Sequence, residues 1–172
     1  SLTNNAPITV RDSDAVGSYT LLIDGLTIAE TTRPLGFSDF EGLELTNSTL
    51  NLNISDDSRG LVFQTSTSGT VLLDNVAVSS AVASEGFTPI YFTNSGSEGT
   101  LGVTLANTTI TFPNASPDAL ATARSIEFSS NTETGKIAIQ TPASIGNSTA
   151  ATTPLTVVYD VPEGADPATV II

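Results

Sequence analysis

Short runs of hydrophobic residues at every second position recur along most of the chain. Examples are Leu26-Thr27-Ile28, Leu50-Asn51-Leu52 and Val76-Ala77-Val78. A period of two is expected of β-strands with one buried face, because successive side chains point to opposite sides of the sheet. Glycine, asparagine, aspartate and proline separate the runs, and these residues favour turns. The pattern therefore predicts an all-β fold of many short strands.

One four-residue template recurs five times. It consists of a breaker or small residue, an aliphatic residue, any residue, and then phenylalanine, with valine in the fifth copy. The copies are Pro34-Leu35-Gly36-Phe37, Gly60-Leu61-Val62-Phe63, Pro89-Ile90-Tyr91-Phe92, Ser125-Ile126-Glu127-Phe128 and Pro154-Leu155-Thr156-Val157. Their aliphatic positions lie 26, 29, 36 and 29 residues apart. Repetition at this interval predicts a stack of similar structural units.

Each copy of the template is followed by a closing glycine, namely Gly42, Gly69, Gly99, Gly135 and Gly164. After the first four glycines a second strand follows, and after the first three this strand leads to a polar two-residue corner and a third strand. The clearest corners are Asp24-Gly25, Asn47-Ser48, Asp74-Asn75 and Asn107-Thr108. Three short strands per unit are typical of a triangular parallel β-helix. We therefore predict a right-handed parallel β-helix of about five to six coils, forming a single domain over residues 1–172 with partial coils at 1–18 and 165–172.

Stacking the units places equivalent side chains in columns, with neighbouring strands about 4.8 Å apart. One predicted core column contains Phe37, Phe63, Phe92, Phe128 and Val157. The Asp and Asn residues of the corners are expected to form another column, bonded to the backbone of the next coil.

The alternative fold is an antiparallel β-sandwich of the donor-strand pilin type. Ser66–Gly69, Asn94–Gly99 and Asn131–Gly135 each have the composition of a hairpin loop. A sandwich explains these hairpins, but it does not explain why the preceding strand keeps one template five times.

The strand, the asparagine-containing corner and the second strand resemble the parallel β-helix repeat superfamily. The similarity is clearest in Gly60–Ser80 and Pro89–Phe112, and it covers about residues 19–164. It implies the fold and an extracellular location. The superfamily includes pectin-type lyases, phage tailspikes, adhesin passengers and filament proteins, so the resemblance does not select a function.

Charge and composition exclude several classes of function. The net charge is −13, with 18 acidic and 5 basic residues, which disfavours nucleic acids and anionic membranes as partners. No apolar run approaches the length of a membrane-spanning helix. The chain has no histidine and no cysteine, which excludes a Ser/His/Asp triad and zinc-thiolate sites. We therefore expect a protein that is not an enzyme, with a polysaccharide lyase or hydrolase as a lesser alternative.

Two kinds of modification or ligand site are suggested by local sequence. Sequons in or beside loops make Asn53, Asn114 and Asn147 candidates for N-glycosylation. Carboxylates that a coil would bring together, or that are neighbours in the sequence, are candidates for Ca²⁺ binding, although solvated charge is the favoured explanation. These residues are Asp12, Asp14, Glu98, Glu133 and Glu163. No other cofactor is expected.

Both partial coils contain an apolar strand that is a candidate for assembly. The first includes Pro7, Ile8, Thr9 and Val10, and the second is Ala168-Thr169-Val170-Ile171-Ile172. Their pairing between copies would complete a shared coil, and a head-to-tail contact that does not close gives an open filament. We therefore expect an extracellular structural subunit that polymerises head to tail. The alternative is a segment of a surface adhesin or phage tailspike that binds glycans.

Overall fold

The structure, a computed structural model, describes residues 2–4, 8–11, 19–54, 58–82, 86–94, 100–113, 115–116, 118–119, 125–130, 136–140, 145–147 and 157–160. Most of these residues lie in strands. The strands are β1 (Leu2–Asn4), β2 (Ile8–Arg11), β3 (Tyr19–Asp24), β4 (Thr27–Thr31), β5 (Leu35–Ser38), β6 (Phe40–Leu52), β7 (Ser58–Thr65), β8 (Gly69–Ser80), β9 (Phe87–Asn94), β10 (Thr100–Ala106), β11 (Thr108–Thr111), β12 (Ile126–Ser130), β13 (Lys136–Gln140), β14 (Ile145–Asn147) and β15 (Val157–Asp160).

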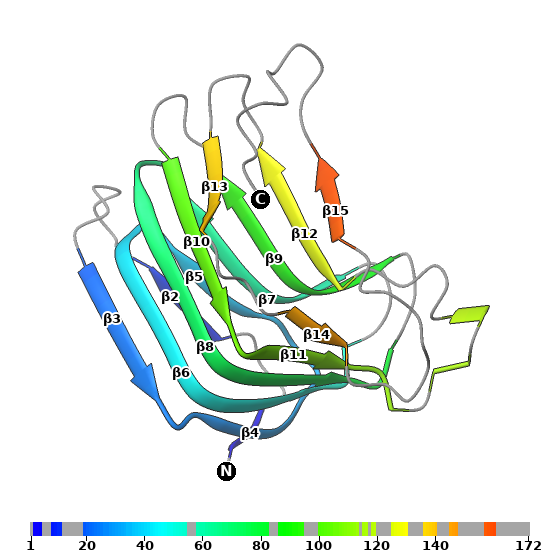
Figure 1. Ribbon diagram of the computed structural model, residues 1–172. Helices are drawn as coiled ribbons and strands as arrows, with labels where there is room; N and C mark the ends of the chain where they lie inside the picture. The colour runs from blue at the N-terminus through cyan, green and yellow to red at the C-terminus, as the bar shows by residue number, and fades with distance from the viewer. Residues whose placement is uncertain are drawn as a thin grey trace.

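The strands form two sheets, and every pairing among the described strands is parallel. Sheet A has nine strands along the path β1-β4-β6-β8-β10-β13, with β3 paired to β6, β11 paired to β8, and β14 paired to β11. Sheet B has six strands in the order β15-β12-β9-β7-β5-β2. The chain passes repeatedly from one sheet to the other and advances by one strand each time (Figure 1). Parallel pairing contradicts the antiparallel sandwich.

Sheet A bends where the sequence predicts corners. Gly25, Asn47, Asn75 and Asn107 all have positive φ, between 49° and 70°. Glycine and asparagine tolerate this left-handed conformation better than other residues. The predicted pairs of separate strands on either side of Asn47 and Asn75 are instead two halves of the long strands β6 and β8.

The phenylalanines of the predicted core column lie in one stack between the sheets. The ring centroids are 5.5 Å apart for Phe37 and Phe63, 5.2 Å for Phe63 and Phe92, and 5.1 Å for Phe92 and Phe128. All four side chains are buried. The strands pair in register at these positions, so each ring meets the ring on the neighbouring strand.

The fifth member of that column was predicted wrongly. Val157 pairs with Ile126, and the residue beside Phe128 is Tyr159. The shift is two residues, which equals the side-chain period of a strand. The period of two along the strand therefore fits both registers. Val157-Val158-Tyr159 also matches the order of the other copies, which is an aliphatic residue, any residue and then an aromatic residue.

The glycines that close successive copies of the template do not occupy one column, although the repeat suggested that they would. Gly42 pairs with Thr70, whereas Gly69 pairs with Leu101. A Cβ at Gly69 would lie 2.5 Å from the carbonyl oxygen of Phe40 and 3.4 Å from its ring. Gly69 is thus required by the close packing of Phe40, and Gly42 is not.

The core is continuous between the two sheets of the described residues and includes Leu43, Leu45, Val71, Leu73, Val103 and Leu105 from sheet A. Strand β9 is buried along its whole length, on both faces. No described helix is long and apolar enough to cross a bilayer.

Candidate functional site

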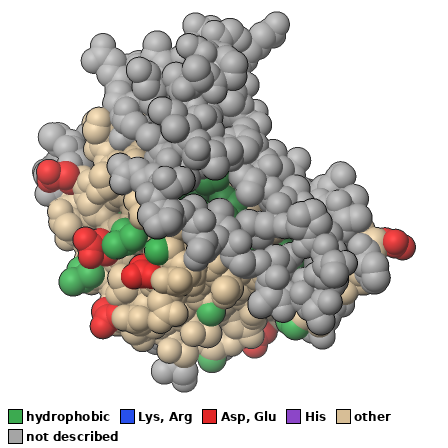
Figure 2. All heavy atoms as spheres, in the orientation of Figure 1, with side chains coloured by type: hydrophobic (Ala, Val, Ile, Leu, Met, Phe, Trp, Pro, Cys, Tyr) green, Lys and Arg blue, Asp and Glu red, His purple; other side chains and the backbone are tan. Residues whose placement is uncertain are grey.

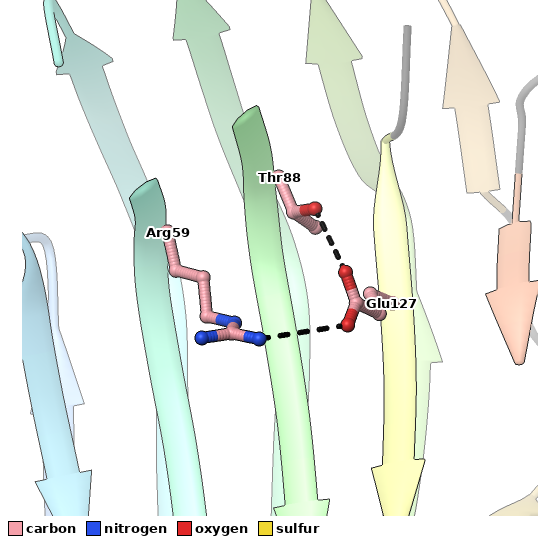
Figure 3. Close-up of polar contacts among 3 residues, drawn as sticks. All are labelled: Arg59, Thr88 and Glu127. Atoms are coloured by element: carbon pink, nitrogen blue, oxygen red, sulfur yellow. Dashed lines mark hydrogen bonds and ion pairs between the residues drawn. The ribbon is translucent and has the colours of Figure 1, made fainter. Parts of the chain in front are cut away.

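A polar cluster occupies the outer face of sheet B. The side chain of Glu127 is only 7% exposed, and one of its carboxylate oxygens accepts a hydrogen bond from the Thr88 hydroxyl at 3.1 Å. The other oxygen lies 3.7 Å from the guanidinium of Arg59, which is 49% exposed. Figure 3 shows the carboxylate of Glu127 between these two partners, which come from neighbouring strands.

Tyr91 completes this cluster. The guanidinium carbon of Arg59 lies 3.9 Å from the centre of the Tyr91 ring, a cation–π contact. Tyr91 and Glu127 are register partners on β9 and β12, and both occupy the unrestricted third position of the repeated template. The sequence contained this signal, but the cluster was not predicted.

The cluster neutralises a carboxylate that folding has removed from water. A buried charge is costly unless it is paired and hydrogen-bonded, and Arg59 with Thr88 meets both conditions for Glu127. Two residues beyond Tyr91 on the same face, the hydroxyl of Thr93 is buried and makes no hydrogen bond with any residue that the structure describes. The arrangement fixes β7, β9 and β12 to one another.

A ladder of amides and carboxylates follows the corner of sheet A. Asn47 donates from its side-chain nitrogen to a carboxylate oxygen of Asp24 at 2.8 Å, and Asn75 donates to the amide oxygen of Asn47 at 2.8 Å. Asn107 donates to the carboxylate of Asp74 at 3.1 Å. The predicted corner column thus links side chains of successive coils, whereas the prediction had these side chains bonding to backbone.

Asp24 is the acidic end of this ladder. Its carboxylate oxygen also accepts a hydrogen bond from the hydroxyl of Thr46 at 2.8 Å. The bond from Asn47 and then the bond from Thr46 hold the pKa of Asp24 below its usual value, because both favour the charged form.

A shallow trough with a volume of about 660 Å³ lies on the outer face of sheet A. Its floor runs across the strands through Gly42, Thr70 and Gly102, which are register partners. Glu41 and Glu44 border it, and Leu72 and Thr104 lie beside the floor. Sequence analysis identified neither the trough nor its residues as a site.

The end of sheet B formed by β2 is an open edge among the described strands. Strand β2 pairs with β5 alone, with Ile8 opposite Leu35 and Val10 opposite Phe37. Val10 therefore continues the phenylalanine column by one strand, and it is 36% exposed. Of the predicted assembly residues, Ile8, Thr9 and Val10 lie in this edge strand, while Pro7 and Ala168–Ile172 lie outside the described residues.

The predicted modification and cation sites are only partly within the described residues. Asn53 is exposed, and its side-chain nitrogen donates to the Glu30 carboxylate at 2.6 Å. Asn147 lies in β14, and Asn114 falls outside the description. The carboxylates proposed for Ca²⁺ also fall outside it, namely Asp12, Asp14, Glu98, Glu133 and Glu163. Within the described ranges, no three or more acidic, histidine or cysteine side chains come together as a metal site would require.

Comparison of the chain with protein-family models, with curated protein sequences and with solved structures gave no match.

Proposed function

We propose that the chain coils as a right-handed parallel β-helix and serves as an extracellular structural subunit that assembles head to tail. The coiling is supported by the strand order, because each passage of the chain between the sheets adds one parallel strand to the same side. Crossovers between parallel strands of one sheet are almost always right-handed. The resemblance of the repeats to β-helix proteins supports the same geometry.

The observation that carries the assembly proposal is the edge at β2. Parallel strands there present backbone N–H and C=O groups along one side, and Val10 leaves the core column partly uncovered. An edge of this kind is a template for another strand. A second copy that adds a strand to β2 continues both the sheet and the core, and repetition of that contact gives a filament.

The surface of the coil supports an extracellular structural role. Its outward columns are rich in hydroxyl and amide side chains that bond from coil to coil, as Ser79 does with Asn51 at 3.1 Å and Asn51 with the Ala29 carbonyl at 3.0 Å. Such ladders fasten successive coils together without disulfides, and the chain contains no cysteine.

Electron microscopy and X-ray diffraction of the purified chain test this function. The chain is expected to form fibres that diffract at about 4.8 Å along the fibre axis, the spacing of stacked strands. Val10→Lys should disperse the fibres, since a charge on an edge strand opposes strand addition. Deletion of Ala168–Ile172, the other predicted assembly segment, should have the same effect.

Thr49→Lys is the matched control, because Thr49 is exposed on the outer face of the central strand β6. It adds the same charge away from the edge and should leave fibres intact. A stable, dispersed monomer of the unmodified chain would overturn the filament proposal and favour a coil segment of a longer surface adhesin.

A further inference from the structure

The trough on sheet A has a floor that packing does not explain. Gly42 and Gly102 lie inside strands, where glycine is unfavourable, and neither has a positive φ. A Cβ at Gly42 would meet its nearest neighbour, the Thr20 methyl group, at 3.4 Å, and one at Gly102 would meet the Thr70 methyl group at 3.5 Å. Both are ordinary contact distances, so a Cβ fits at either position without displacing a neighbour.

Glycine inside a strand often marks a place where a ligand or another backbone approaches closely. Here two such glycines alternate with Thr70 on three successive strands and open directly into the trough. Gly69, by contrast, is needed to admit Phe40. Steric crowding therefore does not require glycine at Gly42 and Gly102, and the depth of the trough results from the choice of glycine at these two positions.

The walls of the trough indicate the chemistry of its occupant. Neither the Glu41 nor the Glu44 side-chain carboxylate forms a hydrogen bond or ion pair with the described residues, and both residues are exposed. In the neighbouring strands, the register partners of Glu44 are Leu22 and Leu72. Leu22 adjoins Glu44 just outside the lining of the trough, and it is 66% exposed, although it is a large apolar side chain. Figure 2 shows acidic and hydrophobic side chains adjoining one another on the left of the visible face.

We propose that this trough binds an extended polypeptide segment rich in lysine or arginine. Aliphatic stems of such side chains pack on Leu22 and Leu72 while their charged ends meet Glu41 and Glu44. The net charge of −13 attracts a cationic partner over a longer range. Sugar rings are a poorer match, because none of the described residues that line the trough is aromatic.

The test uses the full chain and a short synthetic peptide of alternating lysine and serine, with affinity measured by fluorescence anisotropy. The central variant is the double substitution Gly42→Val with Gly102→Val. Valine favours strands and fills the floor without changing the net charge. Binding should weaken by about tenfold or more, while the thermal unfolding temperature stays the same or rises.

Gly36→Val is the matched control. Gly36 lies in β5 of sheet B, and a Cβ there would meet only the Thr9 side chain, at 3.7 Å. This variant should bind the peptide as the unmodified chain does. Equal loss of affinity in both valine variants, or no loss in either, would show that the peptide follows overall charge and would overturn the proposal.

A second pair of variants tests the acidic wall. Glu44→Gln should weaken binding by up to about fivefold at low salt, the range for one exposed ion pair, with the difference fading as salt is added. Asp118→Asn removes the same charge at an exposed position outside the trough and should have little effect. Tight binding of a neutral oligosaccharide that is lost in the double valine variant would identify a glycan as the occupant and contradict the peptide proposal.

Discussion

The rings of Phe63 and Phe92 are stacked with their centroids 5.2 Å apart and their planes 17° apart, although 29 residues separate them in the chain. Phe92 also stacks on Phe128 at 5.1 Å, so it occupies the interior of the column. Contacts on both sides mean that its loss leaves a cavity that the coil cannot close by shifting one neighbour.

Phe92→Ala should therefore lower the free energy of unfolding by about 3–5 kcal/mol, as for other buried aromatic residues. Phe92→Leu keeps most of the volume and should cost clearly less. Urea unfolding followed by circular dichroism measures both. A loss below about 1 kcal/mol for the alanine variant would contradict a buried, in-register stack.

Asn75 has a φ of 55° inside the long strand β8. Asn75→Ala should lower the free energy of unfolding by about 1–2 kcal/mol more than Asn75→Gly does, because the left-handed conformation is sterically unfavourable for alanine and not for glycine. Both variants lose the hydrogen bond to Asn47, so the difference between their stabilities reports the cost of the backbone conformation alone. Equal stabilities in chemical denaturation would argue against a left-handed corner at this position.

Acid should weaken the corner ladder at Asp24. The folded-state pKa of Asp24 is depressed, so its contribution to stability is present above the unfolded value near 3.8 and is lost as the pH falls through the folded pKa. Asp24→Asn should flatten the part of the stability–pH curve that lies below about pH 4. Asp118→Asn, at another exposed aspartate, is the comparison variant, and an identical curve for both would contradict the role of Asp24.

The contacts of Glu127 with Thr88 and Arg59 should stabilise sheet B. Glu127→Ala removes the acceptor of the buried Thr88 hydroxyl and should cost about 1–3 kcal/mol. Glu127→Gln keeps an oxygen for Thr88 and loses only the charge that faces half-exposed Arg59, so we expect a smaller loss. If the glutamine variant is as unstable as the alanine variant, the ion pair rather than the hydrogen bond holds the strands.

Much of the parallel strand stacking was predictable because the strands repeat a template. Phe37, Phe63, Phe92 and Phe128 occupy one position of that template, and parallel pairing brings this position into contact from strand to strand. Val157 was placed two residues away from its observed register, because a shift of two preserves the alternation on which the prediction depended.

The surface sites were harder to predict because they depend on outward positions, which the template leaves free. Tyr91 and Glu127 adjoin only once the register is known, and Arg59 reaches them from outside the template. The trough arises from Gly42, which looks like a turn residue in the sequence, and Gly102, which the sequence already placed in a strand; both lie inside strands in the structure.

Disulfide trapping tests the in-register parallel stacking most directly, and the chain has no native cysteine to interfere. Thr49 and Ala77 are register partners on β6 and β8. Their Cα atoms should lie about 4.8 Å apart, within the range that a disulfide spans. Thr49→Cys with Ala77→Cys should therefore oxidise rapidly within one chain.

The control pair combines Thr49→Cys with Ser79→Cys, since Ser79 is the partner of Asn51 and lies two residues further along β8. That offset should separate the Cα atoms by about 8 Å, beyond the usual disulfide limit. Fast closure of the pair at 49 and 77 together with slow closure of the pair at 49 and 79 is the result we predict. Failure of the first pair to close, or equal rates for the two, would contradict the parallel coil.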